Sequence, residues 1–137
     1  GFNYLTYDDE LESAFAKTYE LLKPGGIFIF DISSHYKLSK ILGNNMYGEN
    51  REDVAYMWQN YFDNEQNLVE MELAFFVKDE KGKFDKFEER HYQRAYTEEE
   101  IIESLQISGF ENIKVYGDFT FEKPKKDSER LFFVCRK

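Results

Sequence analysis

The chain has 137 residues, of which 33% are charged and 18% are aromatic, and its formal net charge is −9. This length suits one domain with a hydrophobic core, and the composition excludes disordered or low-complexity material. The negative charge argues against nucleic acid and anionic membranes as partners, because no basic face would neutralise phosphates. A single cysteine excludes an internal disulfide and a cysteine-based metal site, and we expect no metal. The sequence shows no signal peptide or long apolar span, which predicts a cytoplasmic protein.

The first predicted element is a helix over residues 10–22. Asp8 or Asp9 can cap its start, and Glu10 and Glu12 favour the positive end of the helix dipole. One face is apolar at helical spacing, which predicts packing on a sheet. The positions on that face are Leu11, Ala14, Phe15, Thr18 and Leu22.

A turn and a strand follow this helix. Pro24-Gly25-Gly26 cannot continue a helix, and the run Ile27–Phe30 has no polar face. The run therefore predicts a central, parallel-type strand that is covered on both sides. Asp31 ends the strand, at the edge where open α/β sheets bind ligands. Helix and strand form the second half of a crossover unit, whose preceding strand would lie upstream of residue 1.

The middle of the chain changes to the two-residue period of half-buried strands. After a loop over residues 32–36, a short helix is predicted at Lys37–Leu42, and residues 46–53 are expected to be polar and mobile. Strands are then predicted at Val54–Phe62, from Val69 onward, and at Phe84–Tyr96. The turn chemistry of their connections joins them as a three-stranded antiparallel meander.

The last part of the chain returns to a helix and two strands. Thr97 and Glu100 form a capping box, and Gly109 ends the helix that they begin. Strands are predicted at Glu111–Gly117 and Leu131–Cys135, with a polar loop between them.

The order of these segments resembles the class I S-adenosylmethionine-dependent methyltransferases. The resemblance covers essentially the whole chain and is closest to a bacterial small-molecule subgroup with a β-meander lid. It implies an α/β fold, in which residues 1–137 form one domain with the last strands of a seven-stranded Rossmann-like sheet. Residues 54–96 would be the inserted lid. The segments that carry the resemblance are "LKPGGIFIFDISS", "HYQRAYTEEEI", "GF" and "ERLFFVCRK".

The chain departs from this family at the cofactor. The family's glycine-rich loop and its ribose-binding acid precede the region matched here, and no G-x-G pattern occurs in the sequence. The resemblance therefore implies the C-terminal half of an enzyme, with S-adenosylmethionine bound by the complete protein and weakly or not at all by this chain. The alternative function is a non-enzymatic α+β module that binds a ligand or a protein through the meander.

The resemblance and the residues together indicate candidate site residues. The family pattern places Asn3 and Tyr4 beside the methionine portion of the cofactor, or they are ordinary loop residues. Asp31 either faces the acceptor or caps the turn after its strand. Tyr36 and Lys37 either close over the pocket or lie on the surface of a short helix. We name no catalytic residue, because methyl transfer from a sulfonium depends mainly on alignment and exclusion of water.

Further candidates lie on the meander. Arg94, flanked by Tyr92 and Tyr96 on one face of its strand, would clamp an acceptor carboxylate or would pair with a neighbouring acid. The other face carries Phe87, Glu89, His91 and Gln93. His91 is a general base for an amine or hydroxyl acceptor, or only a hydrogen-bonding residue. Trp58 faces either the pocket or the core.

The predicted topology also suggests a partner. Ile27–Phe30 should pair with Leu131–Cys135 on one side, and its other edge would have no partner within the chain. An apolar unpaired edge is a template for another strand. We therefore expect a homodimer or an exchange of elements through residues 27–31, besides a small-molecule acceptor.

Overall fold

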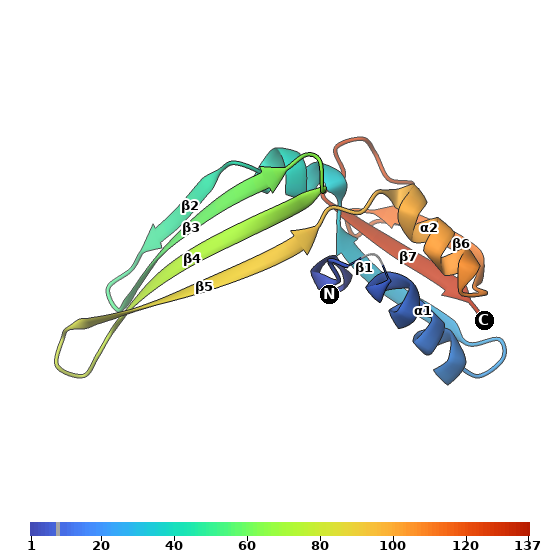
Figure 1. The fold of residues 1–137 in the computed structure, drawn as a ribbon, viewed down its shortest axis with the longest axis horizontal. Helices are drawn as coiled ribbons and strands as arrows, with labels where there is room; N and C mark the ends of the chain where they lie inside the picture. Colours follow the sequence, from blue (N-terminus) through green and yellow to red (C-terminus); the bar gives the residue numbers. More distant parts are fainter. Residues whose placement is uncertain (8) are drawn as a thin grey trace.

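The computed structural model describes residues 1–7 and 9–137 of the chain. Across these residues the strands form two antiparallel sheets, in the orders β1-β7-β6 and β2-β3-β4-β5. Figure 1 shows the first sheet together with helices α1 and α2 as a body, from which the second sheet extends as a long blade. We call the four-stranded sheet the lid. The fold is thus mixed α/β, as expected.

The body contains the elements predicted for the two ends of the chain. They are α1 (Glu10–Leu21), β1 (Ile27–Ser33), α2 (Glu98–Ile107), β6 (Glu111–Gly117) and β7 (Arg130–Arg136). Both β1 and β6 pair antiparallel with β7, which therefore lies at the centre of the sheet. The predicted pairing of Ile27–Phe30 with Leu131–Cys135 is confirmed.

Both helices of the body cover the same face of this sheet, and the core lies between them and the strands. Each fully buried large apolar side chain stabilises the fold by roughly 1.5–3 kcal/mol relative to its exposure to water. The buried side chains are Leu11 and Phe15 from α1, Ile101 and Leu105 from α2, and Phe30, Ile32, Leu131, Phe133 and Cys135 from the sheet. The helical spacing of Leu11 and Phe15 correctly predicted the buried face of α1.

Some of the helix ends that the sequence predicted are found in the structure. At α2, the Glu100 amide donates to Thr97 Oγ1 (3.2 Å) and the Thr97 amide donates to Glu100 Oε2 (2.7 Å), which confirms the capping box. Asp9, one of the two predicted candidates, occupies the N-cap of α1, but its side chain makes no capping hydrogen bond with the described residues. The other cap candidate, Asp8, lies outside the described residues. Gly25 and Gly109 have φ values of 76° and 96°, which favour glycine.

The structure corrects the expectation for β1. The strand lies at an edge of the three-stranded sheet, and its alternate residues Ile27 and Ile29 are 52% and 63% exposed. Only the face that carries Phe28 and Phe30 is covered by the described residues. Continuous hydrophobicity correctly indicated a strand with two apolar faces, but within these residues the second face has no covering layer.

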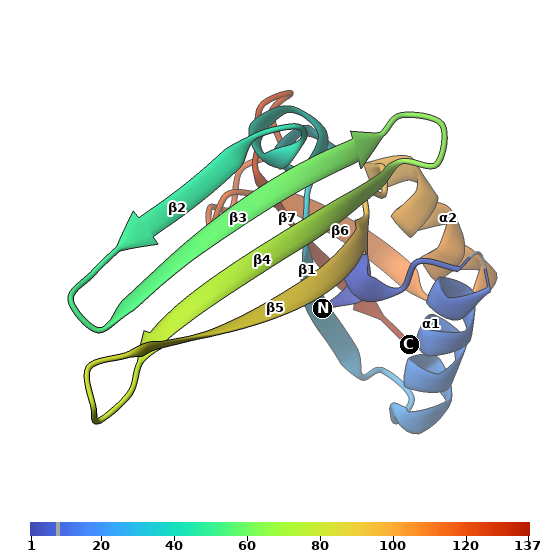
Figure 2. The same ribbon diagram turned by 60° about the vertical axis from the view of Figure 1, so that its left-hand side comes forward.

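The lid has one strand more than the sequence predicted. Its strands are β2 (Met46–Asn50), β3 (Val54–Asp63), β4 (Leu68–Lys78) and β5 (Phe84–Arg94). Residues 46–50, expected to be mobile, pair with β3 in the register Met46↔Gln59 to Asn50↔Ala55. Their polar composition did not predict a strand. β2 is a short edge strand, whose backbone hydrogen bonds are made with one neighbouring strand only. Figure 2 shows the four strands side by side, in front of the body sheet.

Two short helical segments join the lid to the body. The first, η1 (Phe2–Tyr4), contacts both β1 and β5. The second is the predicted helix η2 (Lys37–Leu42), a π-helix that packs on the body end of the lid. Leu38 of η2 is fully buried against Val69 and Met71 of β4, which gives the lid a small core of its own.

Candidate functional site

The two faces of the lid differ in what they can contact. Side chains alternate along a strand, so His91 and Gln93 project from one face while Tyr92 and Arg94 project from the other. We call the face that carries Trp58, Met71 and His91 the inner face. The two sets border different hollows of the surface, which confirms the predicted division of this strand.

A hollow of about 340 Å³ lies where the inner face meets the body, and we call it the junction pocket. Its volume falls within the range of small-molecule sites. The carboxyl end of β1 contributes Ser33, so the pocket is at the sheet edge where the sequence placed a ligand. The lining residues are Tyr4, Ser33, Lys37, Leu42, Trp58, Met71, Leu73, His91, Gln93 and Arg130.

Asn3 positions the N-terminal wall of this pocket. Its side-chain Nδ2 donates to the carbonyl oxygens of Ser33 and Arg94, both at 3.0 Å, and its Oδ1 accepts from the Ser33 amide at 2.9 Å. The side chain is buried, and both of its N–H groups are used within the chain. The side chain of Asn3 therefore fixes η1 between the two sheets.

Tyr4 and His91 face each other at the mouth of the pocket. Their rings are edge to face, with centroids 6.0 Å apart. His91 Nε2 lies 3.0 Å from Glu89 Oε2, on the same face of β5. A carboxylate on one ring nitrogen orients the imidazole and leaves Nδ1 as the second polar atom of the ring. His91 thus has the environment of a proton acceptor that is oriented by a carboxylate.

Trp58 forms the apolar wall opposite. It packs on Tyr47 with a centroid distance of 5.3 Å, and it contacts the small core of the lid. Its indole Nε1 is buried and has no hydrogen-bond partner among the described residues. The sequence left open whether Trp58 faces the pocket or the core, and it does both.

Two ion pairs form the charged side of the pocket. Lys37 Nζ lies 3.2 Å from Glu129 Oε2, and Arg130 pairs with Asp31. Asp31 therefore reaches the pocket only through Arg130, a residue that the sequence analysis did not select. The predicted pairing of the first and last strands could have indicated Arg130. An antiparallel partner of β1 must begin beside the carboxyl end of β1, and in the structure Arg130 lies opposite Ser33.

Besides Asn3 and Asp31, which stand behind the lining residues, three more predicted site residues lie outside the junction pocket. Arg94 lies over the ring of Tyr96 (5.1 Å from its centroid), and its Nη2 is 3.8 Å from Glu100 Oε1. Tyr96 is buried, and its hydroxyl donates to the Leu5 carbonyl oxygen. Tyr36 borders a separate hollow beside the start of α2. The structure does not bring these three residues to the same place as His91 and Trp58.

The hollow at Tyr36 has its own electrostatics. Glu98 lies there, and burial raises the pKa of its carboxyl, with a smaller contribution from the neighbouring Glu99. Lys125 and Lys126 border the same hollow from the loop before β7. These charges come from segments remote from the lid strands, which separates this hollow from the junction pocket.

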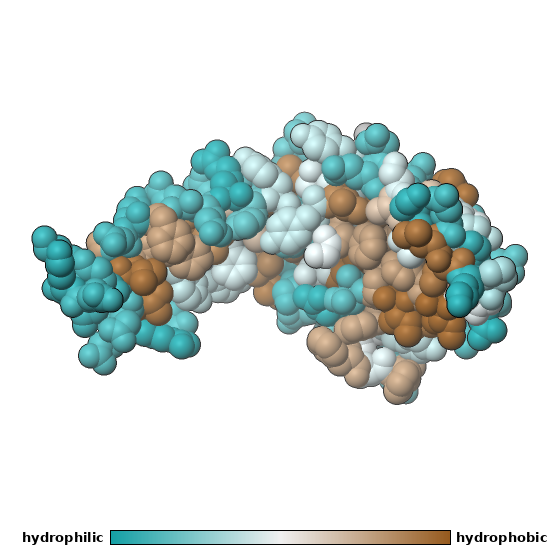
Figure 3. Space-filling view, turned by 90° about the horizontal axis from the view of Figure 1, so that it is seen from below, coloured by the Kyte–Doolittle hydropathy of each residue, from teal (hydrophilic) through white to brown (hydrophobic). Residues whose placement is uncertain are grey.

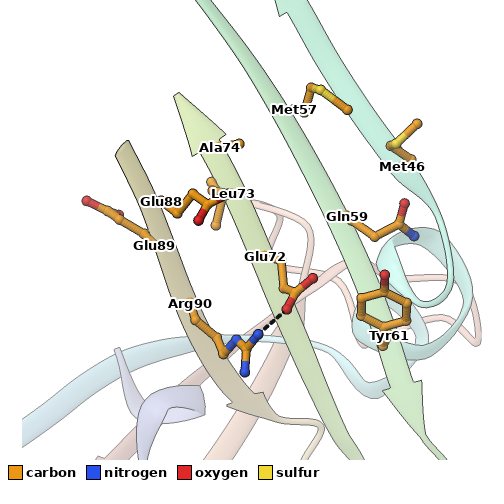
Figure 4. A pocket seen from close by; sticks show the side chains of 10 residues that line it. All are labelled: Met46, Met57, Gln59, Tyr61, Glu72, Leu73, Ala74, Glu88, Glu89 and Arg90. Carbon is orange, nitrogen blue, oxygen red and sulfur yellow. Dashed lines mark hydrogen bonds and ion pairs between the residues drawn. The ribbon is translucent and has the colours of Figure 1, made fainter. Parts of the chain in front are cut away.

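A larger hollow of about 630 Å³ lies on the outer face of the lid (Figure 4). It is lined by Met46, Met57 and Tyr61 on one side, and by Glu72, which pairs with Arg90, on the other. No element of the body contributes to it. The smaller junction pocket, where η1, η2, β1, β7 and the lid converge, is therefore the candidate ligand site.

The residues that the family resemblance implies for the cofactor lie at different places in the structure. The adjacent glycines Gly25 and Gly26 lie at the amino end of β1, opposite the pocket at Ser33. Tyr4 borders the pocket, whereas the side chain of Asn3 makes its hydrogen bonds to the backbone of Ser33 and Arg94.

Other kinds of site are also limited by the structure. Within residues 1–7 and 9–137, no three His, Cys, Asp or Glu side chains are grouped as a metal site would require. Over the same ranges, no helix combines the length and hydrophobicity needed to cross a membrane.

Comparison with known proteins confirms the resemblance to bacterial methyltransferases. No family model matches the chain. Two curated proteins, each named "Putative methyltransferase", align with all of it: one of Geobacillus sp. (strain WCH70) at 37% identity, and YqeM of Bacillus subtilis (strain 168) at 34%. The chain covers 56% and 55% of their lengths, so it spans about half of the curated relatives that it matches.

Solved structures give the same result. An S-adenosylmethionine-dependent methyltransferase from Clostridium acetobutylicum ATCC 824 superposes with a TM-score of 0.89 at 37% identity, over 99% of this chain and 54% of that one. The amino pentose methyltransferase CalS10 from Micromonospora echinaspora shares the fold, with a TM-score of 0.73 at 18% identity over 99% of this chain and 54% of its own. The chain is thus similar to about half of a methyltransferase.

Proposed function

We propose that this chain is the acceptor-binding and lid portion of an S-adenosylmethionine-dependent methyltransferase that acts on a small molecule. The observation that supports this most is the junction pocket itself. It lies at the carboxyl end of β1, under a lid, in a chain similar over its whole length to methyltransferases. Sheets of this class bind ligands at that edge.

The chain's own residues would align the acceptor and exclude water from it. Tyr4 and Trp58 offer apolar ring surfaces, and Met71 and Leu73 floor the pocket between them. Methyl transfer in line from a sulfonium gains mainly from such positioning. When bound by the complete protein, S-adenosylmethionine would supply the methyl group.

The acceptor nucleophile must lose a proton, and His91 is placed to take it. The imidazole stands in the pocket with Glu89 on Nε2, so Nδ1 is the atom assigned to the acceptor proton. General bases work best when their pKa is close to the working pH, which suits histidine. An amine or a hydroxyl is the acceptor group that this arrangement favours.

Arg94 has a different proposed role from the one predicted by its sequence context. Its contacts with Tyr96 and Glu100 join the end of β5 to the start of α2. We therefore propose that Arg94 and Tyr96 anchor the lid, and that Lys37 and Arg130 line the acceptor pocket with Asp31 behind them. Gln93 is added to the pocket as a neutral hydrogen-bonding group.

A chimaera tests this function. The matching part of the Clostridium acetobutylicum methyltransferase would be replaced with this chain, whose fold superposes closely. The chimaera is expected to bind S-adenosylmethionine and to release S-adenosylhomocysteine when small amines or alcohols are supplied. Release should fall by about 10²- to 10⁴-fold in His91→Ala, the range typical of a lost general base. Cofactor binding without release on a broad acceptor screen would contradict the proposal.

The non-enzymatic alternative makes a different prediction for the same pocket. A binding module would bind small molecules in this pocket, but the chimaera would release no S-adenosylhomocysteine with any of them. No described residue favours that alternative specifically. The His91–Glu89 contact favours the enzyme part.

A further inference from the structure

The inner face of the lid continues beyond the junction pocket as a row of aromatic rings. Tyr56, Phe75 and Phe87 lie opposite one another on three neighbouring strands, in the register Tyr56↔Phe75↔Phe87. The rings of Phe75 and Phe87 are stacked at 5.1 Å and 18°, and Tyr56 lies 6.2 Å from Phe75. We call these three residues the aromatic row.

The row and the pocket lie on one continuous surface. Phe87 precedes His91 by four residues, and Phe75 follows Met71 by four, so both share the face of their pocket neighbour. Tyr56 precedes Trp58 by two residues on β3. Four residues at about 3.3 Å each place the row about 13 Å from His91 and Met71 along the strands, whereas the pocket residues Trp58 and Leu73 are only about 7 Å from it.

The row is exposed in a way that core residues are not. The side chain of Phe87 is 47% exposed and that of Val77, at the end of the same face, is 39% exposed. Figure 3 shows an apolar patch on the lid, bounded by hydrophilic groups at its outer end and separate from the apolar surface of the body. Phe87 is the exposed ring of the stacked pair, and Phe75 beneath it is half-buried; an exposed flat ring suits contact with another planar apolar group.

The charges beside the row restrict what can bind there. Glu89 lies on the inner face between Phe87 and His91, and its side chain is 51% exposed. Glu49 of β2 lies opposite Tyr56 on the same face, and Arg51 pairs with it. Arg51 offsets the charge of Glu49, whereas Glu89 leaves a carboxylate between the row and His91, which favours neutral or cationic ligands over phosphorylated or carboxylated ones.

We propose that the acceptor is an elongated neutral or cationic molecule, whose planar apolar part stacks on the aromatic row while its amine or hydroxyl lies in the junction pocket. The continuity of the row with the pocket supports a single ligand that spans both. This inference rests on the proposed function for the identity of the reacting end, but not for the binding itself. A compact acceptor would leave the row without a role.

Three synthetic probes test the proposal on the full chain. The first joins a naphthalene ring to a primary amine by a linker of about 13 Å, the separation of Phe87 from His91 along β5. The second lacks the ring, and the third carries a carboxylate in place of the amine.

Binding is followed by the fluorescence of Trp58, the only tryptophan, and by NMR shifts of the lid amides. The ring should tighten binding about five- to tenfold over the ringless amine, as an aromatic pair does. The carboxylate probe should bind more weakly than the amine.

Matched variants locate the contact. Phe87→Ala should remove the gain from the ring, whereas Phe84→Ala should retain it. Phe84 is the control because it is 49% exposed on the same strand but projects from the opposite face. Phe87→Leu keeps an apolar side chain without a planar one and should also lose most of the gain. Equal unfolding midpoints of the variants would show that their folds are comparable.

Three results would overturn the inference. They are equal affinities of the ringed and ringless amines, equal losses in Phe87→Ala and Phe84→Ala, and a Phe87-dependent dimer by sedimentation with no ring-dependent binding. The last result would assign the row to a second copy of the chain. None of these measurements needs methyl transfer. A failed chimaera with intact ring-dependent binding would therefore contradict the proposed function alone.

Discussion

Asn3 and Ser33 hold each other by a reciprocal pair of hydrogen bonds. The Ser33 amide donates to Asn3 Oδ1 (2.9 Å), and Asn3 Nδ2 donates back to the Ser33 carbonyl oxygen (3.0 Å). The same Nδ2 reaches the carbonyl oxygen of Arg94 (3.0 Å). One buried amide thereby joins η1, the end of β1 and the end of β5.

Replacement of Asn3 should destabilise the whole chain. Asn3→Ala leaves the Ser33 amide and two carbonyl oxygens without partners, and we expect a loss of about 2–4 kcal/mol from three net hydrogen bonds. Urea unfolding followed by circular dichroism measures it. Asn3→Asp should also be destabilising, because a carboxylate would face two carbonyl oxygens. A loss below about 1 kcal/mol in both variants would show that η1 is not held in this way.

Substitutions of two neighbouring residues of β5 should have different effects on ligand affinity and on the stability of the fold. Gln93→Ala is expected to weaken binding of the ringless amine in the junction pocket by about fivefold, with little change in the unfolding midpoint. Arg94→Ala should leave that affinity unchanged but lower stability by about 1 kcal/mol, through loss of its contacts with Tyr96 and Glu100. Trp58 fluorescence and thermal unfolding measure the two effects. If Arg94→Ala weakened binding and Gln93→Ala did not, the result would support the role of Arg94 as a clamp on the acceptor.

The chain by itself should bind S-adenosylmethionine no better than about millimolar, since the glycine-loop and ribose contacts of the family are not formed by these residues. Isothermal titration calorimetry measures this affinity directly. The chimaera described above is the positive control and should bind much more tightly. Micromolar binding to the chain alone would mean that a cofactor site exists among the residues described.

Cys135 should make the stability of the chain depend on pH at the alkaline end. Burial raises the pKa of its thiol from 9.0 to about 11. Below pH 9 the thiol is protonated in both the folded and unfolded states, so it adds no pH dependence there. Between about pH 9 and 11 the unfolded state releases the proton first, so stability falls as pH rises. Cys135→Ala should remove this part of the alkaline loss of stability, although the variant also loses core packing.

Alkylation of Cys135 by iodoacetamide at pH 8 should be slow until the chain unfolds. Rapid alkylation of the folded chain would contradict the burial of the thiol.

The far edge of β1 should promote association of the isolated chain. Among the described residues that edge has no strand partner, and the adjacent Ile27 and Ile29 are exposed. Light scattering is expected to show a mass that increases with concentration, and Ile29→Lys should reduce it. Ile107→Lys, at a position equally exposed on α2, is the control and should have no such effect. A monomer at all concentrations would show that the edge does not associate.

The sequence predicted most of the body because its signals there are local. The spacing of Leu11 and Phe15, the capping box of Thr97 and the turn at Gly25 each act within a few residues, and the structure contains each of them. By contrast, β2 is stabilised by pairing with β3, so its polar sequence alone predicted no strand. The burial of β1 depends on which segments cover it, and that information lies outside the strand.

The site was predicted in part for the same reason. Alternation along β5 placed His91 and Gln93 together correctly, because it is a local property. Arg130 was missed, since only its register beside Ser33 brings it to the pocket. Arg94 was chosen for its chemistry between two tyrosines, but the face of the strand directs it toward α2. Chemistry-based selection identifies suitable residues, whereas topology decides which of them meet.

The contacts of Asn3 also bear on how proteins of this shape diversify. The side-chain amide of Asn3 donates to the carbonyl oxygens of both Ser33 and Arg94. The chain leaves the body after Ser33 and returns to it at Arg94, so these two points lie within reach of one side chain. The segment between these points has a core of its own, formed around Leu38, Val69 and Met71. Such a segment is a cassette: it can be lengthened, recombined or exchanged without moving the strands on either side. The surface of the lid can thus change while the body sheet stays the same.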